Sequence, residues 1–263
     1  MGFSASKFII DYRNQILLET STNHAAKIPE SSSDKLYNSI IRIKPCEEDI
    51  SGTGFFLKLN IKDKKQIFLV SCNHLITKDL VDKKKEIDIY FGKINNEIKK
   101  TIRLDKDQRY IRIFEIPIDI ILIEIKKTDN IPEDKYLYPD LNYKNGYNLY
   151  ESKDFYLAGY PANKKERCIS SGKIKIISNF ELEHTLDTGI GSSGSPICLS
   201  ENLNVVGIHL KGDKTLPLNY GTLLGYVIDI IDKEDYRTEE KKEEEKKRKK
   251  EEKNKEENKD KKK

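Results

Sequence analysis

Short apolar runs follow one another between residues 38 and 229, separated by Gly, Asn, Asp or Lys. About twelve such runs can be distinguished: NSIIRIKP, GTGFFLKLN, KQIFLVSC, KEIDIYFG, KKTIRLD, YIRIFEI, IDIILIEI, DFYLAGYP, GKIKIISNF, SGSPICLS, NVVGIHLKG and YGTLLGYVID. They are rich in Ile, Val, Phe and Tyr, and almost none has a helical period. Many short strands at this spacing are typical of an all-β sandwich or barrel. We therefore expect an all-β fold.

A looser, Tyr-rich stretch over residues 126–147 interrupts these runs about midway. It predicts two β units, at residues 38–135 and 136–232. Residues 1–37 precede them, with a short amphipathic helix expected within residues 4–20 and a linker after it. This helix either packs on the body or contacts a membrane, and we favour packing. A Lys/Glu-rich tail over residues 233–263 follows the second unit.

The charge of the chain is concentrated in that tail. Residues 237–263 hold 14 Lys and Arg against 10 Asp and Glu, which accounts for the whole formal charge of +4. The remaining 34 basic and 34 acidic residues balance, so the body is not a basic nucleic-acid-binding surface. Glu and Lys four residues apart support an isolated charged helix. We expect the tail to be a solvated helix or disordered, and assign no chemistry to it.

The four cysteines are Cys46, Cys72, Cys168 and Cys198. They form no CxxC pair and no cysteine–histidine pattern at zinc-ligand spacing, so neither a metal nor a cofactor is predicted. A disulfide is possible but not indicated. No secretory signal is visible and no apolar run approaches 18 residues, so we expect a cytoplasmic protein with free thiols.

The N-terminus carries a lipidation pattern. Met1 and Gly2 followed by Ser6 fit the N-myristoylation template, and Lys7 adds a positive charge nearby. Gly2 is therefore a candidate acylation site. One acyl chain gives only marginal membrane binding, so weak membrane association is the expectation.

The stretch GSSGSP, from Gly191 to Pro196, contains the candidate nucleophile. A serine needs a base and a group that orients that base. Of the four histidines, His74 ends an apolar run, where it could face the site or be a half-buried strand-end residue. Asp119 lies in another apolar run, where burial would require a partner, or it lies exposed at a strand start.

The order His74, Asp119, Ser193 is that of the chymotrypsin class of triads. The motifs GTGFFLKL…FLVSCNHLI, IDIILIEI, LAGYP, TGIGSSGSP and VVGIHLKG follow the order and rough spacing of trypsin-like serine peptidases. The sequence resembles this family over residues 38–232, most of all its glutamyl endopeptidase branch. The resemblance implies two six-stranded antiparallel β-barrels with a catalytic triad between them. The expected activity is a serine endopeptidase acting on a protein or peptide through an acyl-enzyme.

The resemblance also suggests roles around the serine. The backbone amides of Gly191 and Ser193 would form the oxyanion hole. Ser192 stands where trypsin has an aspartate that pairs with a newly cut N-terminus, so that mode of activation is not expected. Thr188 and His209 match residues that line the S1 subsite of glutamyl endopeptidases, which predicts cleavage after Glu, with Gln as the second choice.

Some alternatives remain open at this stage. His209 could instead be a core residue of its strand, and His184 matches no motif, so a structural or solvated role is expected for it. The whole chain could be a catalytically silent trypsin-fold binding module or pseudoenzyme at a membrane. A further alternative makes the charged tail an adaptor.

Overall fold

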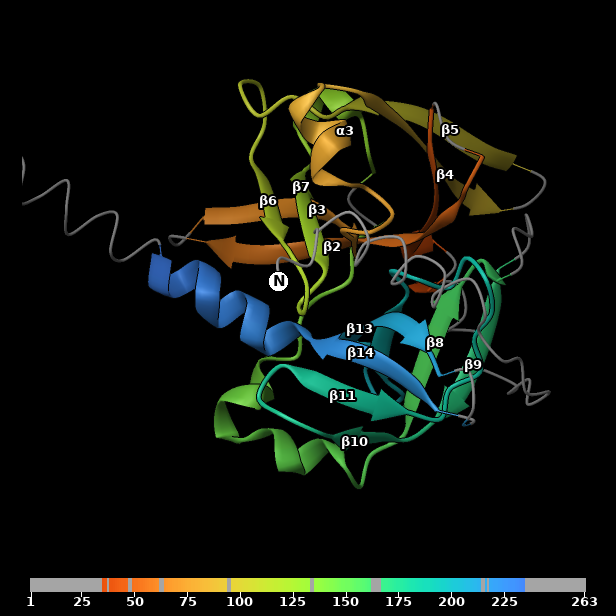
Figure 1. The fold of residues 1–263 in the computed structure, drawn as a ribbon, viewed down its shortest axis with the longest axis vertical. Helices are drawn as coiled ribbons and strands as arrows, with labels where there is room; N and C mark the ends of the chain where they lie inside the picture. The colour runs from red at the N-terminus through yellow and green to blue at the C-terminus, as the bar shows by residue number, and fades with distance from the viewer. Residues whose placement is uncertain are drawn as a thin grey trace, which may run out of the picture.

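The computed structural model describes residues 35–36, 38–46, 49–61, 64–93, 96–132, 135–161, 167–213, 216 and 218–234. The chain forms two seven-stranded antiparallel sheets, which occupy the upper and lower halves of Figure 1. The first sheet has the order β5-β4-β1-β2-β3-β7-β6. Its strands are β1 (Ile40–Pro45), β2 (Gly52–Ile61), β3 (Lys64–Cys72), β4 (Glu86–Lys93), β5 (Asn96–Arg103), β6 (Ile111–Phe114) and β7 (Ile120–Glu124).

The second sheet has the order β10-β11-β14-β13-β12-β8-β9. Its strands are β8 (Phe155–Gly159), β9 (Cys168–Gly172), β10 (Ile174–Ile176), β11 (Glu181–His184), β12 (Pro196–Leu199), β13 (Val205–Gly212) and β14 (Asn219–Leu223). Between the sheets the chain forms the 3-10 helices η1 (Lys127–Asp129), η3 (Leu141–Asn145) and η4 (Tyr147–Tyr150). The all-β, trypsin-like double-barrel class expected from the sequence is confirmed.

The number of strands differs from the expected six in each barrel. All seven strands of the first sheet correspond to predicted runs, whereas the second sheet has two that were not predicted, β9 and β11. β9 is a small, polar edge strand (CISSG), and β11 has only four residues (ELEH). Neither is apolar enough to be recognised from its own sequence. Each is stabilised by backbone hydrogen bonds to a neighbouring strand, which the local sequence does not show.

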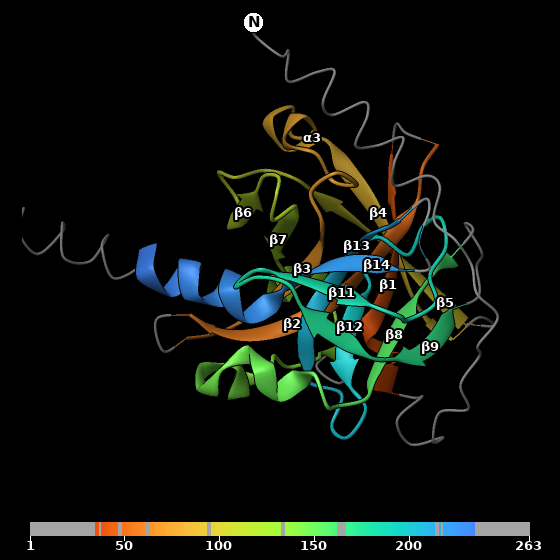
Figure 2. The same cartoon turned by 60° about the horizontal axis from the view of Figure 1, so that its bottom comes forward.

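At the C-terminal end of the described residues, the structure corrects the predicted secondary structure. The run YGTLLGYVID was expected to be one strand, but β14 ends at Leu223 and residues 224–234 are helical. The helix buries apolar residues at helical spacing, namely Leu224, Val227, Ile228 and Ile231. In Figure 1 it lies, in blue, between the β2–β3 hairpin and the green 3-10 segment, and Figure 2 shows it continuing from β14. Asp229 accepts a hydrogen bond from Tyr143 in that segment, and Glu234 pairs with Arg112 of β6.

The core joins the two sheets. One cluster of buried apolar residues draws on both, from Phe55 and Leu57 of β2 to Ile197 of β12 and Ile208 of β13. A second cluster belongs to the first sheet but includes Leu210 of β13. The strand β13 therefore packs into both units and fixes their relative position. The domain limits at residues 135 and 136 stay a prediction.

Several expectations lie outside the described residues. These are the N-terminal helix within residues 4–20, the candidate acylation site Gly2 and most of the charged tail. Residues 35–36 and 38–39 are helical, and Leu36 is buried in the core. Within the part of the chain that the structure covers, no helix has the length and apolarity needed to cross a bilayer.

Candidate active site

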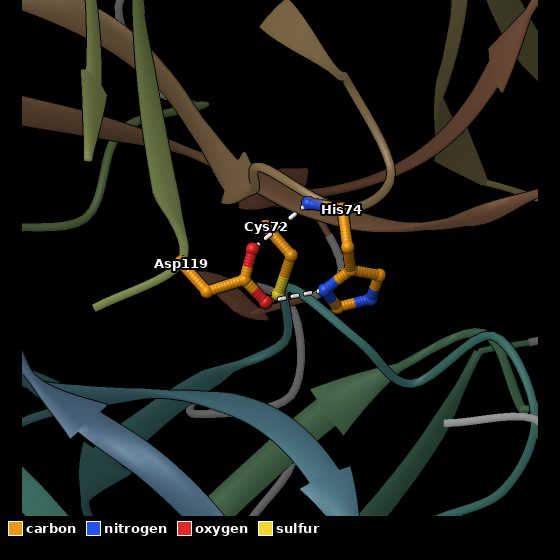
Figure 3. Close-up of side chains that lie close together, drawn as sticks. All are labelled: Cys72, His74 and Asp119. Atoms are coloured by element: carbon orange, nitrogen blue, oxygen red, sulfur yellow. Dashed lines mark hydrogen bonds and ion pairs between the residues drawn. The ribbon is translucent and has the colours of Figure 1, made fainter. Parts of the chain in front are cut away.

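His74 and Asp119 form a pair at the edge of the first sheet, in which Asp119 is buried and His74 is partly buried. His74 lies in the turn after β3, and Asp119 immediately precedes β7. The His74 ring Nδ1 is 2.5 Å from Asp119 Oδ2, and the His74 amide donates to Asp119 Oδ1 at 2.9 Å (Figure 3). Because a carboxylate only accepts, the ring carries its hydrogen on Nδ1 when the imidazole is neutral. Asp119 thereby holds the histidine at two points, the ring and the backbone amide.

The backbone around Asp119 fixes the carboxylate. Asp119 is fully buried, so it is not the exposed strand-start residue that the sequence left open. Its φ of +55° is in the left-handed region, which Asp adopts more readily than most residues. Its carbonyl accepts from the Asn73 amide at 3.1 Å, and the preceding carbonyl of Ile118 accepts from the Thr222 hydroxyl at 2.9 Å. The backbone at Asp119 is thus held by contacts from both sheets.

Ser193 lies in a tight turn between β11 and β12. The Ser192 amide donates to the Gly189 carbonyl at 2.8 Å, and the Gly189 amide donates to Ser192 Oγ at 3.0 Å. Gly191 and Gly194 have φ values of +95° and +90°, which favour glycine. The buried Ser192 side chain therefore closes this turn. Ser192 stands where trypsin has an aspartate, and its side chain makes a hydrogen bond within the loop.

Thr53 of β2 anchors this turn to the first sheet. The Thr53 amide donates to the Ser193 carbonyl at 3.0 Å, and the Thr53 hydroxyl donates to the Gly191 carbonyl at 2.8 Å. A Cβ at Gly194 would lie 2.0 Å from the Thr53 carbonyl oxygen and 2.6 Å from Ser71 Oγ. The two sheets therefore touch through backbone at the residues beside Ser193. The oxyanion hole from Gly191 and Ser193 stays a prediction.

The strand β13 contacts the serine loop and the end of β3. Ser193 is almost fully buried, and its hydroxyl donates to the Leu210 carbonyl at 3.0 Å. The adjacent His209 carbonyl accepts from the Gly194 amide at 2.9 Å and from Cys72 Sγ at 3.4 Å. Cys72 is two residues before His74. One short segment of β13 is thus bonded to the serine loop and to the end of β3.

Thr188 is part of a buried hydrogen-bond chain. Its hydroxyl donates to Asn219 Oδ1 at 2.9 Å, and Asn219 Nδ2 donates to the Leu186 carbonyl at 2.8 Å. The Leu186 carbonyl can only accept, which fixes the orientation of the Asn219 amide. The Thr188 hydroxyl hydrogen is therefore directed to Asn219, and only the lone pairs of its oxygen remain for another partner.

His209 pairs with a second histidine. Its Nδ1 is 3.0 Å from Nε2 of His184, and both side chains are fully or almost fully buried. Burial lowers the pKa of His184 well below its usual range; the neighbouring His209 lowers it further, and a backbone bond with Leu186 opposes this. His184 is therefore neutral near pH 7. The expectation of a solvated His184 is wrong, and its structural alternative holds.

Sequence reasoning missed His184, Asn219 and Thr53 as neighbours of the site. One signal could have found His184, because Leu182 and His184 alternate with Glu181 and Glu183 and so share the buried face of β11. The Thr53–Gly191 bond spans 138 positions and carries no local signal.

A cysteine also lies beside the His74–Asp119 pair. The potential ligand atoms of Cys72, His74 and Asp119 all lie within 4.8 Å of one another. Figure 3 shows the Cys72 sulfur close to the Asp119 carboxylate and the inner edge of the ring. The four cysteines are free thiols, of which Cys72 and Cys198 are buried. The sequence predicted no metal site, because it shows no CxxC pair and no cysteine–histidine pattern at zinc-ligand spacing.

Comparison with known proteins identifies the family. The sequence profile of the trypsin-like peptidase domain matches residues 52–208, so the chain belongs to the trypsin-like peptidase family. A search of curated proteins gives no match. The fold is similar to that of Deg5 (TM-score 0.55, 14% identity, 78% of this chain and 95% of that one). It is also similar to a serine endoprotease from Yersinia pestis (TM-score 0.55, 13% identity, 79% of this chain and 67% of that one). At these identities the solved structures establish the fold and not the branch of the family.

Proposed function

We propose that the protein is a serine endopeptidase with His74, Asp119 and Ser193 as its catalytic triad. The observation that carries the proposal is the His74–Asp119 pair, in which the buried carboxylate holds both the ring and the backbone of the histidine. A fully buried carboxylate is costly unless it is partnered, and this one is partnered in the way a triad requires. Membership of the trypsin-like peptidase family supports the same reading.

In the proposed mechanism Ser193 Oγ attacks the scissile carbonyl while His74 Nε2 takes its proton. Asp119 keeps the other ring hydrogen on Nδ1 and stabilises the imidazolium that forms. His74 then donates the proton to the leaving amine, and water hydrolyses the acyl-enzyme by the same steps. Because the Ser193 hydroxyl donates to the Leu210 carbonyl, the cycle begins with rotation of that hydroxyl toward His74.

We further propose that Thr188 and His209 recognise the P1 side chain, as in the glutamyl endopeptidases that the sequence resembles. The hydrogen-bond chain around Thr188 favours Gln over Glu at this position. The Thr188 hydrogen is engaged by Asn219, so its oxygen can accept from a carboxamide but has no donor for a carboxylate. Withdrawing that hydrogen would leave the buried Asn219 oxygen without its donor, at a cost of about 1–3 kcal/mol.

The pair of His184 and His209 also favours Gln over Glu at P1. His184 is neutral, since burial lowers its pKa, so the pair brings no fixed positive charge from that residue to a P1 carboxylate. Both Thr188 and His209 are buried, so the subsite has to open for a P1 side chain to reach them.

The enzyme proposal is tested with a fluorophosphonate probe and a peptide library. We expect the full-length chain to be labelled, the label to disappear in Ser193→Ala and to be retained in the matched variant Ser195→Ala, whose serine belongs to the turn. Absence of label on folded wild-type protein would support the alternative, a trypsin-fold binding module without catalysis. Cleavage only after Lys, Arg or large aromatic residues would contradict the P1 proposal and leave the triad intact.

A further inference from the structure

We propose that Cys72, His74 and Asp119 form a binding site for Zn²⁺ whose occupancy silences the peptidase site. The three side chains offer a sulfur, an imidazole nitrogen and a carboxylate oxygen within 4.8 Å of one another. Such a set matches the ligands that zinc takes in proteins, whereas Mg²⁺ and Ca²⁺ require oxygen ligands. Binding of the metal requires no catalysis, whereas the silencing rests on the proposed peptidase function.

The charges of the three groups suit a buried metal. Cys72 and Asp119 are fully buried, and the His74 side chain is 11% exposed. A thiolate and a carboxylate together neutralise a divalent ion, so the occupied site carries no net charge into the interior. Binding releases the thiol proton to solvent and moves the ring hydrogen of neutral His74 from Nδ1 to Nε2, because both atoms bind metal through a lone pair.

The geometry requires a small movement. His74 Nδ1 and Asp119 Oδ2 are 2.5 Å apart, whereas two such ligands on a tetrahedral zinc ion lie about 3.4 Å apart. The pair therefore separates by about 1 Å when the ion enters. The Cys72 thiol, which donates to the His209 carbonyl, exchanges that hydrogen bond for a bond to the metal.

The ion would take the place of the hydrogen on His74 Nδ1 that bonds to Asp119 Oδ2. In that state Asp119 cannot stabilise an imidazolium, and the ring is fixed by the metal and not oriented for Ser193. Zinc is thus expected to inhibit the enzyme from the inner side of the histidine. Binding through Cys72 distinguishes this from zinc that attaches to a histidine at the surface.

The experiment uses full-length protein in which the exposed Cys46 and Cys168 are replaced by serine. Cd²⁺, a spectroscopic substitute for Zn²⁺, is titrated while the cadmium–thiolate charge-transfer band is followed, and fluorophosphonate labelling is measured with and without Zn²⁺. We expect a saturable charge-transfer band with Cd²⁺. Labelling should be slower in the presence of Zn²⁺ and unchanged in the presence of Mg²⁺. In Cys72→Ala the band should disappear, and the zinc concentration for half inhibition should rise at least about tenfold.

Two control variants make the result specific. Cys198→Ala removes the other buried thiol, whose pKa burial raises to about 12, and should retain the band and the zinc sensitivity. Ser193→Ala should retain the band although it cannot be labelled, so failure of the proposed function and failure of the metal site are distinguishable. No band in the parent protein, or equal zinc sensitivity in Cys72→Ala, would overturn the proposal.

Discussion

The Thr53 amide of β2 donates a hydrogen bond to the carbonyl of Ser193, which lies 140 positions later in the chain, at 3.0 Å. The side chain of Thr53 holds the Gly191 carbonyl of the same turn, and its carbonyl oxygen lies where a side chain at Gly194 would have to go. The serine loop is therefore built against the other sheet and not only on its own strand.

Gly194→Ala tests this backbone contact. A methyl group would lie 2.0 Å from the Thr53 carbonyl oxygen on a residue with φ +90°, so either the sheets separate or the turn changes. We expect a loss of about 2–5 kcal/mol of unfolding free energy, from the left-handed backbone and from overpacking, and loss of fluorophosphonate labelling. Urea unfolding measures the first effect.

Gly146→Ala is the matched control. Gly146 also has a positive φ, +109°, but the nearest atom to its Cβ is the movable side-chain oxygen of Asn148, at 2.9 Å. This variant should lose about 1–2 kcal/mol and retain labelling. Equal effects of the two variants would show that the contact with Thr53 has no role.

Asp119→Asn separates the chemistry of the carboxylate from its structural role. Asn also tolerates the left-handed backbone of this position, so the fold should be retained. A neutral amide cannot hold the ring hydrogen on Nδ1 in the same way, and kcat should fall by roughly 10³–10⁴. Asp140→Asn, at another buried aspartate that caps η3, should leave kcat near the wild-type value. A full rate in Asp119→Asn would remove Asp119 from the triad.

Asn219→Ala tests the preference for Gln. Without Oδ1 of Asn219, the Thr188 hydroxyl can direct its hydrogen to a P1 carboxylate, so the ratio of kcat/KM for Gln to that for Glu should fall at least about fivefold. Thr222→Val loses a buried hydroxyl on the same strand, which bonds to Ile118, and should lower both values without changing their ratio. An unchanged ratio in Asn219→Ala would contradict the assignment.

The buried His184 predicts how stability depends on pH. Its pKa is lowered in the folded state, so the unfolded chain binds the additional proton and stability falls as the pH drops below about 6.5. Between pH 7.5 and 5.5 this residue should account for a loss on the order of 1 kcal/mol. His184→Gln should make the unfolding free energy correspondingly less sensitive to pH. Equal pH dependence in the two proteins would show that His184 is protonated without cost.

The first sheet could be predicted from sequence, because its seven strands each have a recognisable apolar run. The second sheet was less predictable. β9 and β11 are short and partly polar, and the apolar run at residues 220–229 fits a strand or a helix equally well until packing selects a helix from Leu224 onward. The local apolar pattern indicates which residues of a segment can be buried. It does not indicate which neighbouring element they will pack against.

The candidate site shows the same limit. His74, Asp119 and Ser193 follow from chain order and residue type, and the structure joins the first two directly. The pairing of His209 with His184, and of Thr188 with Asn219, depends on the register of β11, β13 and β14. A shift of one residue in any of these strands would turn the side chains to the opposite face. Such contacts cannot be read from spacing alone.

The bond from the Thr222 hydroxyl to the Ile118 carbonyl has a consequence for biosynthesis. The last strand of the second sheet holds the backbone next to Asp119, so the acid receives its final support only after residue 222 has been made. A chain still emerging from the ribosome would possess His74 and Asp119 long before their surroundings are complete. The surroundings of the candidate triad would thus be completed only after the last strand of the second sheet has been made and has folded.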